Sequence, residues 1–347
     1  MKDAPVLTEA HLHRALLARQ HLLERATVSV PKAVEQLGGL QAQYAPSAYI
    51  GLWSRLEGFE REHLTTALER KKVVQGTMMR ATIHMVSARD YPLVVEGVRT
   101  ARRTWWQRAT RDERTAKAMR SAARRVRTLL AKGPLRRSEL VELLAADGLA
   151  WNGVEYWIDL LRIPPSGTWE QRRADLYATA EQWLGSSKAS EAEGIELLVR
   201  RYLGAFGPAS DKDIANWAGL PTRAIAPAIQ RLKLRRFRDE RGTELLDVRG
   251  GPLPDPETPV PARFLPTWDA TLLVHARRTQ ILPERYRPLV FNTKTPHSVT
   301  TFLVDGRVAG TWRSEGGRVT IQPFEGLSRG SGREIREEAE RLTTFLR

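Results

Sequence analysis

Residues 191–248 change from a helical to a strand pattern, and this change constrains the fold more than any other feature of the sequence. Three helices are predicted there, over 191–206, 212–218 and 222–232. A tight Gly-Leu-Pro turn separates the last two. Residues 234–248 then form strand-like runs around a turn at 240–242, which is typical of a β-hairpin. Two helices joined by a tight turn and followed by a hairpin "wing" are a winged helix-turn-helix.

The same order of elements occurs twice more upstream. For the middle unit the predicted elements are helices over 90–132, 135–146 and 151–161, a turn at 164–169, and strand-like residues at 176–177. For the first unit they are helices over 8–25, 31–37 and 60–69, and a strand pair within 73–86. We therefore predict three tandem winged-helix units, over 1–115, 116–188 and 189–250.

The C-terminal part has a different pattern. Residues 250–261 are rich in glycine and proline, which indicates a linker. Beyond it, six strands are predicted: 263–265, 270–275, 289–291, 298–304, 307–312 and 318–322. Their spacing favours a small β-barrel or a curled antiparallel sheet over 262–347, with a terminal helix over 332–345. The predicted fold class is α+β.

The net charge of the chain is +15, and most of it lies in one segment. Between Arg99 and Arg137, 14 Lys and Arg residues stand against two acidic residues, so this segment carries +12. Helical spacing places Arg120, Arg124 and Arg127 on one face. A clustered excess of this kind favours double-stranded DNA as partner over a merely solvated helix face.

Several classes of protein are disfavoured by residues that the sequence lacks. It has no cysteine, its seven histidines show no metal-ligand spacing, and no glycine-rich phosphate loop is present, so we expect neither a metal nor a cofactor. No apolar run has the length of a membrane span, and the N-terminus has no secretory signal. We expect a monomer in the cytoplasm, associated with the nucleoid.

One short stretch carries a candidate chemical function. Gln41-Ala42-Gln43 follows the helix-ending pair Gly38-Gly39, so an extended backbone is favoured there. Residues two apart on an extended backbone point to the same side, so the two amides converge. Two neutral amides can hold a water or the edge of a base, whereas the alternative is a pair of solvated loop amides.

Other polar residues are candidates for DNA binding. Strict alternation from Arg80 predicts that Arg80, Thr82 and His84 share one face of a strand. Three roles remain open for them: contact with phosphate, support of the glutamine segment (residues 41–43), and plain structural hydrogen bonding. His275, Arg277 and Arg278 are predicted at the barrel rim, as DNA contacts or as a solvated rim.

Five segments resemble one family over almost the whole chain: 36–43, 51–55, 80–86, 263–269 and 306–312. They are similar to the AlkZ/YcaQ family of winged-helix DNA glycosylases. The resemblance implies three winged helices and a β-barrel around a DNA channel, and removal of N7-alkylated purines, including bulky adducts and interstrand crosslinks. The family motif is Gln-x-Gln in the AlkZ branch and Gln-x-Asp in the YcaQ branch. With Gln43 in the second place, the chain resembles the AlkZ branch, which implies that Gln41 and Gln43 are catalytic.

The chemistry of such a reaction suits this pair. N7-alkylation puts a positive charge on the purine, so the base leaves without a general acid, and the sugar becomes oxocarbenium-like. Two amide oxygens can then position water and stabilise the sugar cation. No lysine is implicated, so we expect a monofunctional glycosylase, serving either DNA repair or self-resistance to a genotoxin. The alternative is a non-catalytic winged-helix DNA-binding protein, such as a transcription regulator or a damage sensor, which has no need of the glutamine pair.

Overall fold

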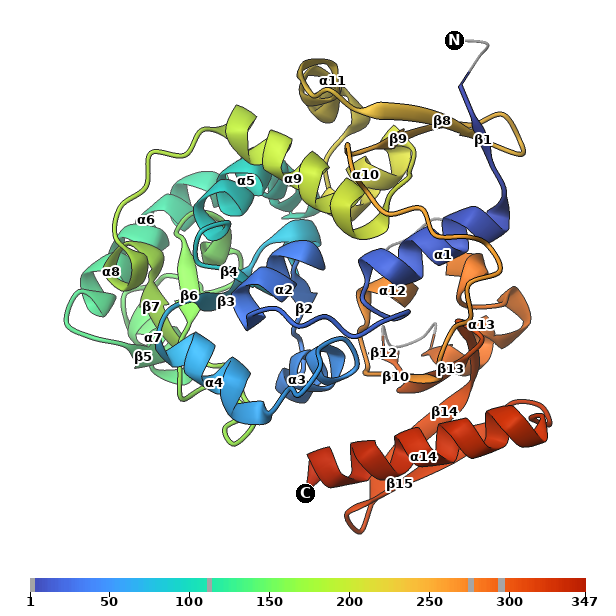
Figure 1. The fold of residues 1–347 in the computed structure, drawn as a ribbon. Coiled ribbons are helices and arrows are strands. Elements are labelled where there is room, and N and C mark those ends of the chain that lie inside the picture. The colour runs from blue at the N-terminus through green and yellow to red at the C-terminus, as the bar shows by residue number, and fades with distance from the viewer. Residues whose placement is uncertain (1–3, 111–113, 274–277, 293–296) are drawn as a thin grey trace.

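The sheet with the most strands in the described residues has six, all antiparallel, and lies on one side of the molecule (Figure 1). The computed structural model describes residues 4–110, 114–273, 278–292 and 297–347. The strands run in this order: β2 (Leu40–Gln41), β4 (Ile83–Ser87), β3 (Val73–Thr77), β6 (Leu160–Arg162), β7 (Leu176–Thr179) and β5 (Leu135–Arg136). The junction between β3 and β6 pairs Gln75 with Arg162. Strands of the first and second predicted units therefore belong to one sheet.

Three helices pack against the first half of this sheet: α2 (Val30–Gln36), α3 (Ala45–Trp53) and α4 (Arg61–Glu69). Helix α1 (Glu9–Arg19) lies against the third unit instead. The helix predicted over 8–25 ends earlier, at Arg19. Helix α3 was not predicted. It begins after the extended residue Tyr44, has Pro46 in its first turn, and is buried from Ala45 to Leu52. A helix buried all round has no polar face and therefore no amphipathic period to detect.

The basic segment forms two helices rather than the single one predicted over 90–132: α5 (Tyr91–Thr110) and α6 (Arg114–Leu130). The apolar stripe of α6 is buried against α7 (Arg137–Ala146). The helix predicted over 151–161 is wrong. Gly153 has a left-handed φ of 88°, and only the 3-10 turn η2 (Val154–Tyr156) lies between it and β6. The short helix α8 (Ala180–Leu184) follows β7.

The third unit has the predicted elements: α9 (Glu191–Phe206), α10 (Asp211–Ala218), α11 (Thr222–Arg231), β8 (Arg235–Asp239) and β9 (Glu244–Asp247). Ser190 and Ser210 cap α9 and α10, each in a reciprocal bond with an acidic residue three positions on. Gly219, with φ of 70°, ends α10. The N-terminal strand β1 (Val6–Leu7) pairs in parallel with β8 and so joins this unit.

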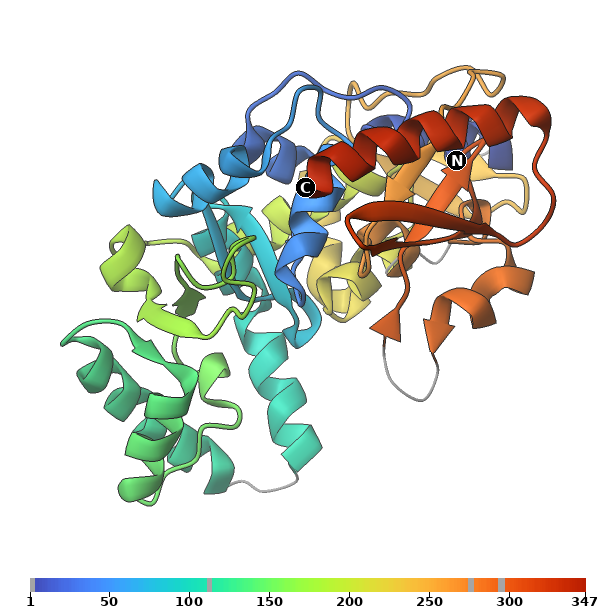
Figure 2. The ribbon, with the colours of Figure 1, turned by 90° about the horizontal axis from the view of Figure 1, so that it is seen from below.

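A separate sheet forms most of the C-terminal part, in the order β10 (Arg263–Leu265), β13 (Thr301–Val304), β14 (Arg307–Glu315) and β15 (Arg318–Pro323). Helix α14 (Arg329–Leu346) lies along it (Figure 2). In the described residues no pairing joins β10 to β15, so the sheet is open where a closed barrel was among the predictions. The middle unit and this sheet lie at opposite ends of the molecule (Figures 1 and 2).

Helices replace some of the predicted C-terminal strands. Residues 270–275 were predicted as a strand, but α12 (Ala270–Leu273) lies there. The reason is local: Asp269 accepts hydrogen bonds from the backbone and hydroxyl groups of Thr271, as a residue at a helix start does. The remaining short elements are η3 (Arg278–Gln280), η4 (Glu284–Tyr286), α13 (Arg287–Val290), β11 (Phe291–Asn292) and β12 (His297–Ser298).

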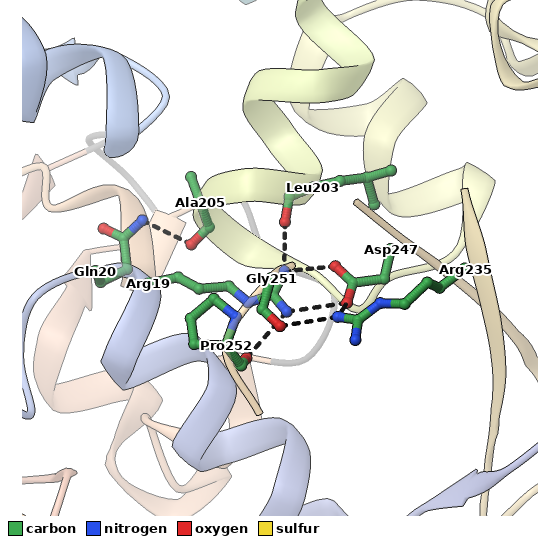
Figure 3. A network of polar contacts seen from close by, with 8 residues as sticks. All are labelled: Arg19, Gln20, Leu203, Ala205, Arg235, Asp247, Gly251 and Pro252. Atoms are coloured by element: carbon green, nitrogen blue, oxygen red, sulfur yellow. Dashed lines mark hydrogen bonds and ion pairs between the residues drawn. The ribbon is translucent and has the colours of Figure 1, made fainter. Parts of the chain in front are cut away.

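A buried network of hydrogen bonds and ion pairs links α1 to the third unit (Figure 3). The guanidinium of Arg19 donates to both carboxylate oxygens of Asp247, at 2.6 and 3.1 Å, and both side chains have no exposed area. Arg19 also donates to the carbonyls of Leu203 and Pro252, and Arg235 contacts Asp247 from the other side. The C-terminal end of α1 is therefore anchored in the interior of the third unit.

Among the helices that the structure describes, none combines the length and the apolar character that crossing a membrane requires.

Candidate active site

The backbone is extended at Leu40–Gln41, as predicted, and Gln43 lies in a bend just beyond this strand. Gly38 and Gly39 have φ of 74° and 87°, which turns the chain out of α2 and into β2. A Cβ on Gly39 would lie 3.2 Å from the carbonyl oxygen of Met85. A side chain at this position would therefore crowd the neighbouring strand and also have to adopt a strained, left-handed φ. Gln41 pairs with His84 on the neighbouring strand.

Hydrogen bonds from two strands hold the residue between the glutamines. The backbone nitrogen of Ala42 donates to the carbonyl of Ile83 at 2.8 Å. Its carbonyl accepts from the side-chain nitrogen of Gln75 at 3.2 Å, and Gln75 is 1% exposed. Ala42 faces the core, Gln41 is half-buried and Gln43 is exposed. Gln75 was not among the predicted site residues, because its one signal in the sequence is a lone glutamine in an apolar strand.

Arg80 fixes the amide of Gln41. One guanidinium nitrogen of Arg80 donates to Gln41 Oε1 at 3.2 Å, and the other donates to the carbonyl of Trp217 in the last turn of α10. Since arginine has only donors, the oxygen and not the nitrogen of the amide must face it. Burial lowers the pKa of Arg80 to about 10, so the group stays charged at neutral pH.

The predicted common strand face of Arg80, Thr82 and His84 is wrong for Arg80. Strand β4 begins at Ile83, and Arg80 and Ala81 have left-handed φ of 51° and 58° in the turn η1 (Met79–Ala81). Left-handed backbone at two successive residues other than glycine is uncommon, so the sequence favoured a strand instead. Because of this turn, the Arg80 side chain contacts both α10 and Gln41.

His84 is buried behind this turn. Its ring is 3% exposed, and Nδ1 donates to the carbonyl of Thr82 at 3.0 Å. Burial, and then the charge of Arg80, lower the pKa of His84 to about 3, so the ring is neutral at physiological pH. The hydroxyl of Thr82 donates to the carbonyl of Met79 at 3.1 Å. The geometry therefore shows internal hydrogen bonding for this group, and contact with phosphate stays a prediction.

A small cavity lies beside Gln41, between β2, α3 and the start of α12. Its volume is about 20 Å³, which is room for about one water molecule. The buried ion pair of Arg55 and Asp269, with 2.9 Å between nitrogen and oxygen, forms part of its wall. Ser47 and Thr267 add a pair of hydroxyl groups 2.7 Å apart. A half-buried amide beside a polar cavity of this size is an arrangement that can order a single water.

The other predicted site residues lie elsewhere. Arg120, Arg124 and Arg127 are exposed on α6, on the face opposite its buried stripe, as the helical spacing predicted. His275 and Arg277 lie outside the described residues. Arg278 begins the turn η3, and its side chain is not described. In the described part of the chain, no three His, Asp or Glu residues are grouped so that they could hold a metal ion.

Comparisons with known proteins show the family of this chain. The family model "DNA glycosylase AlkZ-like" matches residues 34–345. The interstrand DNA cross-link repair glycosylase of Streptomyces sahachiroi is 24% identical, over 93% of this chain and 92% of that protein. The structure of Streptomyces sahachiroi DNA glycosylase AlkZ superposes with a TM-score of 0.81 and 19% identity, over 98% of this chain and 97% of that one. The chain therefore belongs to the AlkZ-like family of DNA glycosylases, which are hydrolases that act on N-glycosyl bonds.

Proposed function

We propose that this DNA glycosylase hydrolyses the N-glycosidic bond of N7-alkylated purines, including bulky adducts and interstrand crosslinks. A crosslink repair enzyme is among its relatives by name. The chemistry agrees with the site, because a cationic leaving group removes the need for a general acid, and the described residues around Gln41 offer amides and hydroxyls. Family membership does not favour the non-catalytic alternative, a regulator or damage sensor.

The observation that carries the proposal is the fixed amide of Gln41. Its oxygen is held by Arg80, its backbone by His84, and a cavity for about one water lies beside it. A dipole fixed before the reaction stabilises developing charge without reorganising during it. In this proposal Gln41 and Gln43 orient the attacking water at C1′ of the sugar, and Gln43 is the partner exposed to substrate.

DNA binding is assigned to the basic helix α6 and its surroundings. Arg120, Arg124 and Arg127 contact phosphates in this proposal, because their charges are exposed and stand on one helix face. We retain the four-part division, with winged-helix units over 1–115, 116–188 and 189–250 and a C-terminal part over 262–347. A monomer, a monofunctional reaction and a cytoplasmic, nucleoid-associated location stay predictions.

The test is single-turnover release of N7-methylguanine from a duplex. Gln41→Ala and Gln43→Ala are each expected to slow release by up to about 10²–10³, since each removes one preorganised contact. Gln43→Asp is expected to retain more activity than Gln43→Ala, because a carboxylate can act as a base and stabilise the sugar cation. Thermal melts and DNA affinity serve as controls for folding and binding.

A duplex with a defined N7-linked interstrand crosslink forms the second arm of the test. Release of the crosslinked purine by the wild type, and its loss in the two Ala variants, is the expected result. A correctly folded Gln41→Ala/Gln43→Ala variant that excises at the wild-type rate would show that the segment is structural, and the catalytic assignment would fall.

A further inference from the structure

A second and larger cavity lies where the end of α5 meets η2, β6 and β7. Its volume is about 580 Å³, within the range of about 300–1,000 Å³ that is usual for sites of small ligands. Four aromatic rings line it: Trp106, Trp151, Tyr156 and Tyr177. None of these residues belongs to the glutamine segment or to the exposed face of α6.

Two contacts place this cavity next to the glutamine segment. Ile83 lines the cavity, and its carbonyl accepts the hydrogen bond from Ala42, the residue between the two glutamines. Tyr44, which follows Gln43, accepts a hydrogen bond from Arg172 at 3.1 Å, and the next residue in that loop, Arg173, lines the cavity. A ligand in the cavity is therefore adjacent to the segment that we assign to catalysis.

The aromatic walls are held in place. Gly153 has a left-handed φ of 88°, and a Cβ there would lie 2.3 Å from the Trp106 ring, so the indole rests directly against glycine backbone. Trp106 also contacts Tyr156, with 5.4 Å between ring centroids, and Trp151 meets Tyr177 edge-on at 5.3 Å. Rings fixed in this way present planar faces, to which other planar groups bind by stacking.

The charged groups at the cavity disfavour a cationic ligand. Of the two carboxylates in the lining, Glu155 already accepts from Tyr177, Arg162 and Thr77, and Asp175 pairs with Arg136 and Arg173. The guanidinium groups of Arg137, Arg162 and Arg173 also line the cavity. A neutral substituent is therefore favoured over a positively charged one.

We propose that this cavity binds a neutral, planar aromatic substituent on the alkylated purine, and that it selects for adducts that carry one. The proposal rests on the proposed function. In a purine only C8 and N9 separate N7 from C1′ of the sugar, so a group on N7 lies next to the point of attack. A cavity beside the catalytic segment is where such a substituent has to be accommodated.

The experiment compares two lesions in one duplex, N7-methylguanine and N7-(acetylbenzyl)guanine, whose substituent supplies a neutral aromatic ring. Trp106→Ala is expected to lower single-turnover release of the acetylbenzyl base by about 10-fold relative to the methyl base, since one aromatic stacking contact is lost. Trp105→Ala is the matched control, because Trp105 adjoins Trp106 on α5, is 54% exposed and does not line the cavity.

A second variant keeps the test independent of folding. Asn152 is an exposed residue of the cavity lining, so Asn152→Trp is expected to fill the cavity and to reduce release of the acetylbenzyl base selectively. An unchanged ratio of the two rates in both variants would overturn the proposal, and so would an equal change in Trp105→Ala.

Two further outcomes are distinguishable. Suppose that Trp106→Ala changes the fluorescence of an unpaired 2-aminopurine in undamaged DNA and leaves the ratio unchanged. The cavity then holds a base rather than a substituent, and the proposal is overturned. Wild-type protein that releases neither lesion contradicts the proposed function itself, whereas release of N7-methylguanine with no effect of the cavity variants contradicts only this inference.

Discussion

The contact between Arg80 and Gln41 predicts a specific pattern of rates. Because Arg80 has a left-handed φ of 51°, Arg80→Gly removes the side chain and leaves a residue that accepts this backbone without strain. A hydrogen bond to a charged group contributes about 1.5–3 kcal/mol. If that energy holds the Gln41 amide in its reactive orientation, its loss slows base release by about 10-fold to 100-fold.

The decisive measurement is a double-mutant cycle in single-turnover release of N7-methylguanine. Arg80 acts through Gln41, so Arg80→Gly combined with Gln41→Ala is expected to be no slower than Gln41→Ala alone, within about twofold. The affinity for undamaged duplex is expected to stay at the wild-type level in Arg80→Gly. Arg333→Ala, which removes an exposed arginine from α14, is the matched control for loss of charge.

Two results would refute this reasoning. If the two substitutions slow the reaction multiplicatively, Arg80 acts independently of Gln41. If Arg80→Gly weakens DNA binding and leaves the rate constant at saturation unchanged, Arg80 is a phosphate contact, which is the other role that its sequence context left open. Thermal melts separate both results from simple unfolding, since Arg80→Gly also leaves the Trp217 carbonyl without this donor.

Three further predictions concern affinity, acid stability and the buried network. Arg124→Ala is expected to weaken binding to damaged and undamaged duplex alike, and to lower the slope of log affinity against log salt concentration by about 1. Fluorescence anisotropy measures both quantities, and an unchanged slope would contradict a phosphate contact. The folded pKa of His84, about 3, lies below the ordinary value of 6.5, so the folded state binds fewer protons and loses stability as pH falls through this window, by about 1.4 kcal/mol per pH unit. Urea melts from pH 7 to pH 4 should therefore show a weaker acid dependence in His84→Gln than in wild type or in the exposed control His63→Gln. Asp247→Asn leaves the Arg19 charge uncompensated in the interior and is expected to cost about 3–5 kcal/mol of unfolding free energy, and a loss below about 1 kcal/mol would mean that the pair is not buried in solution.

The third unit shows where sequence reasoning succeeds. Its helices have serine caps and a glycine stop, and its hairpin has a short polar turn, so each boundary is encoded by residues next to it. The helix predicted over 151–161 failed because Gly153 takes a left-handed conformation under Trp106, a residue that lies far from it in the chain. Boundaries set by local residues were predictable, and those set by distant contacts were not.

The candidate site divides in the same way. Gln41 and Gln43 were predicted from a short pattern and a family resemblance, and the extended backbone at Gln41 followed from Gly38 and Gly39. The contacts that support the two glutamines were only partly predicted, because support of this segment was one of three roles left open for Arg80, and Gln75 was not singled out. Gln75 reaches Ala42 across 33 positions, and Arg80 reaches Trp217 across 137, and a single sequence carries no sign of such contacts.

The anchoring of Arg80 on α10 has a consequence for the timing of synthesis. The chain carries both glutamines soon after translation begins, but the carbonyl that holds Arg80 belongs to a residue made 137 positions after it. At about 5–20 residues per second, Trp217 follows Arg80 by roughly 7 to 27 seconds. The partner of Arg19 comes later still, 228 positions downstream. A chain whose synthesis has reached only α9 therefore contains Gln41 and Gln43 but lacks the α10 carbonyl that anchors Arg80. We expect such a chain not to release bases from DNA.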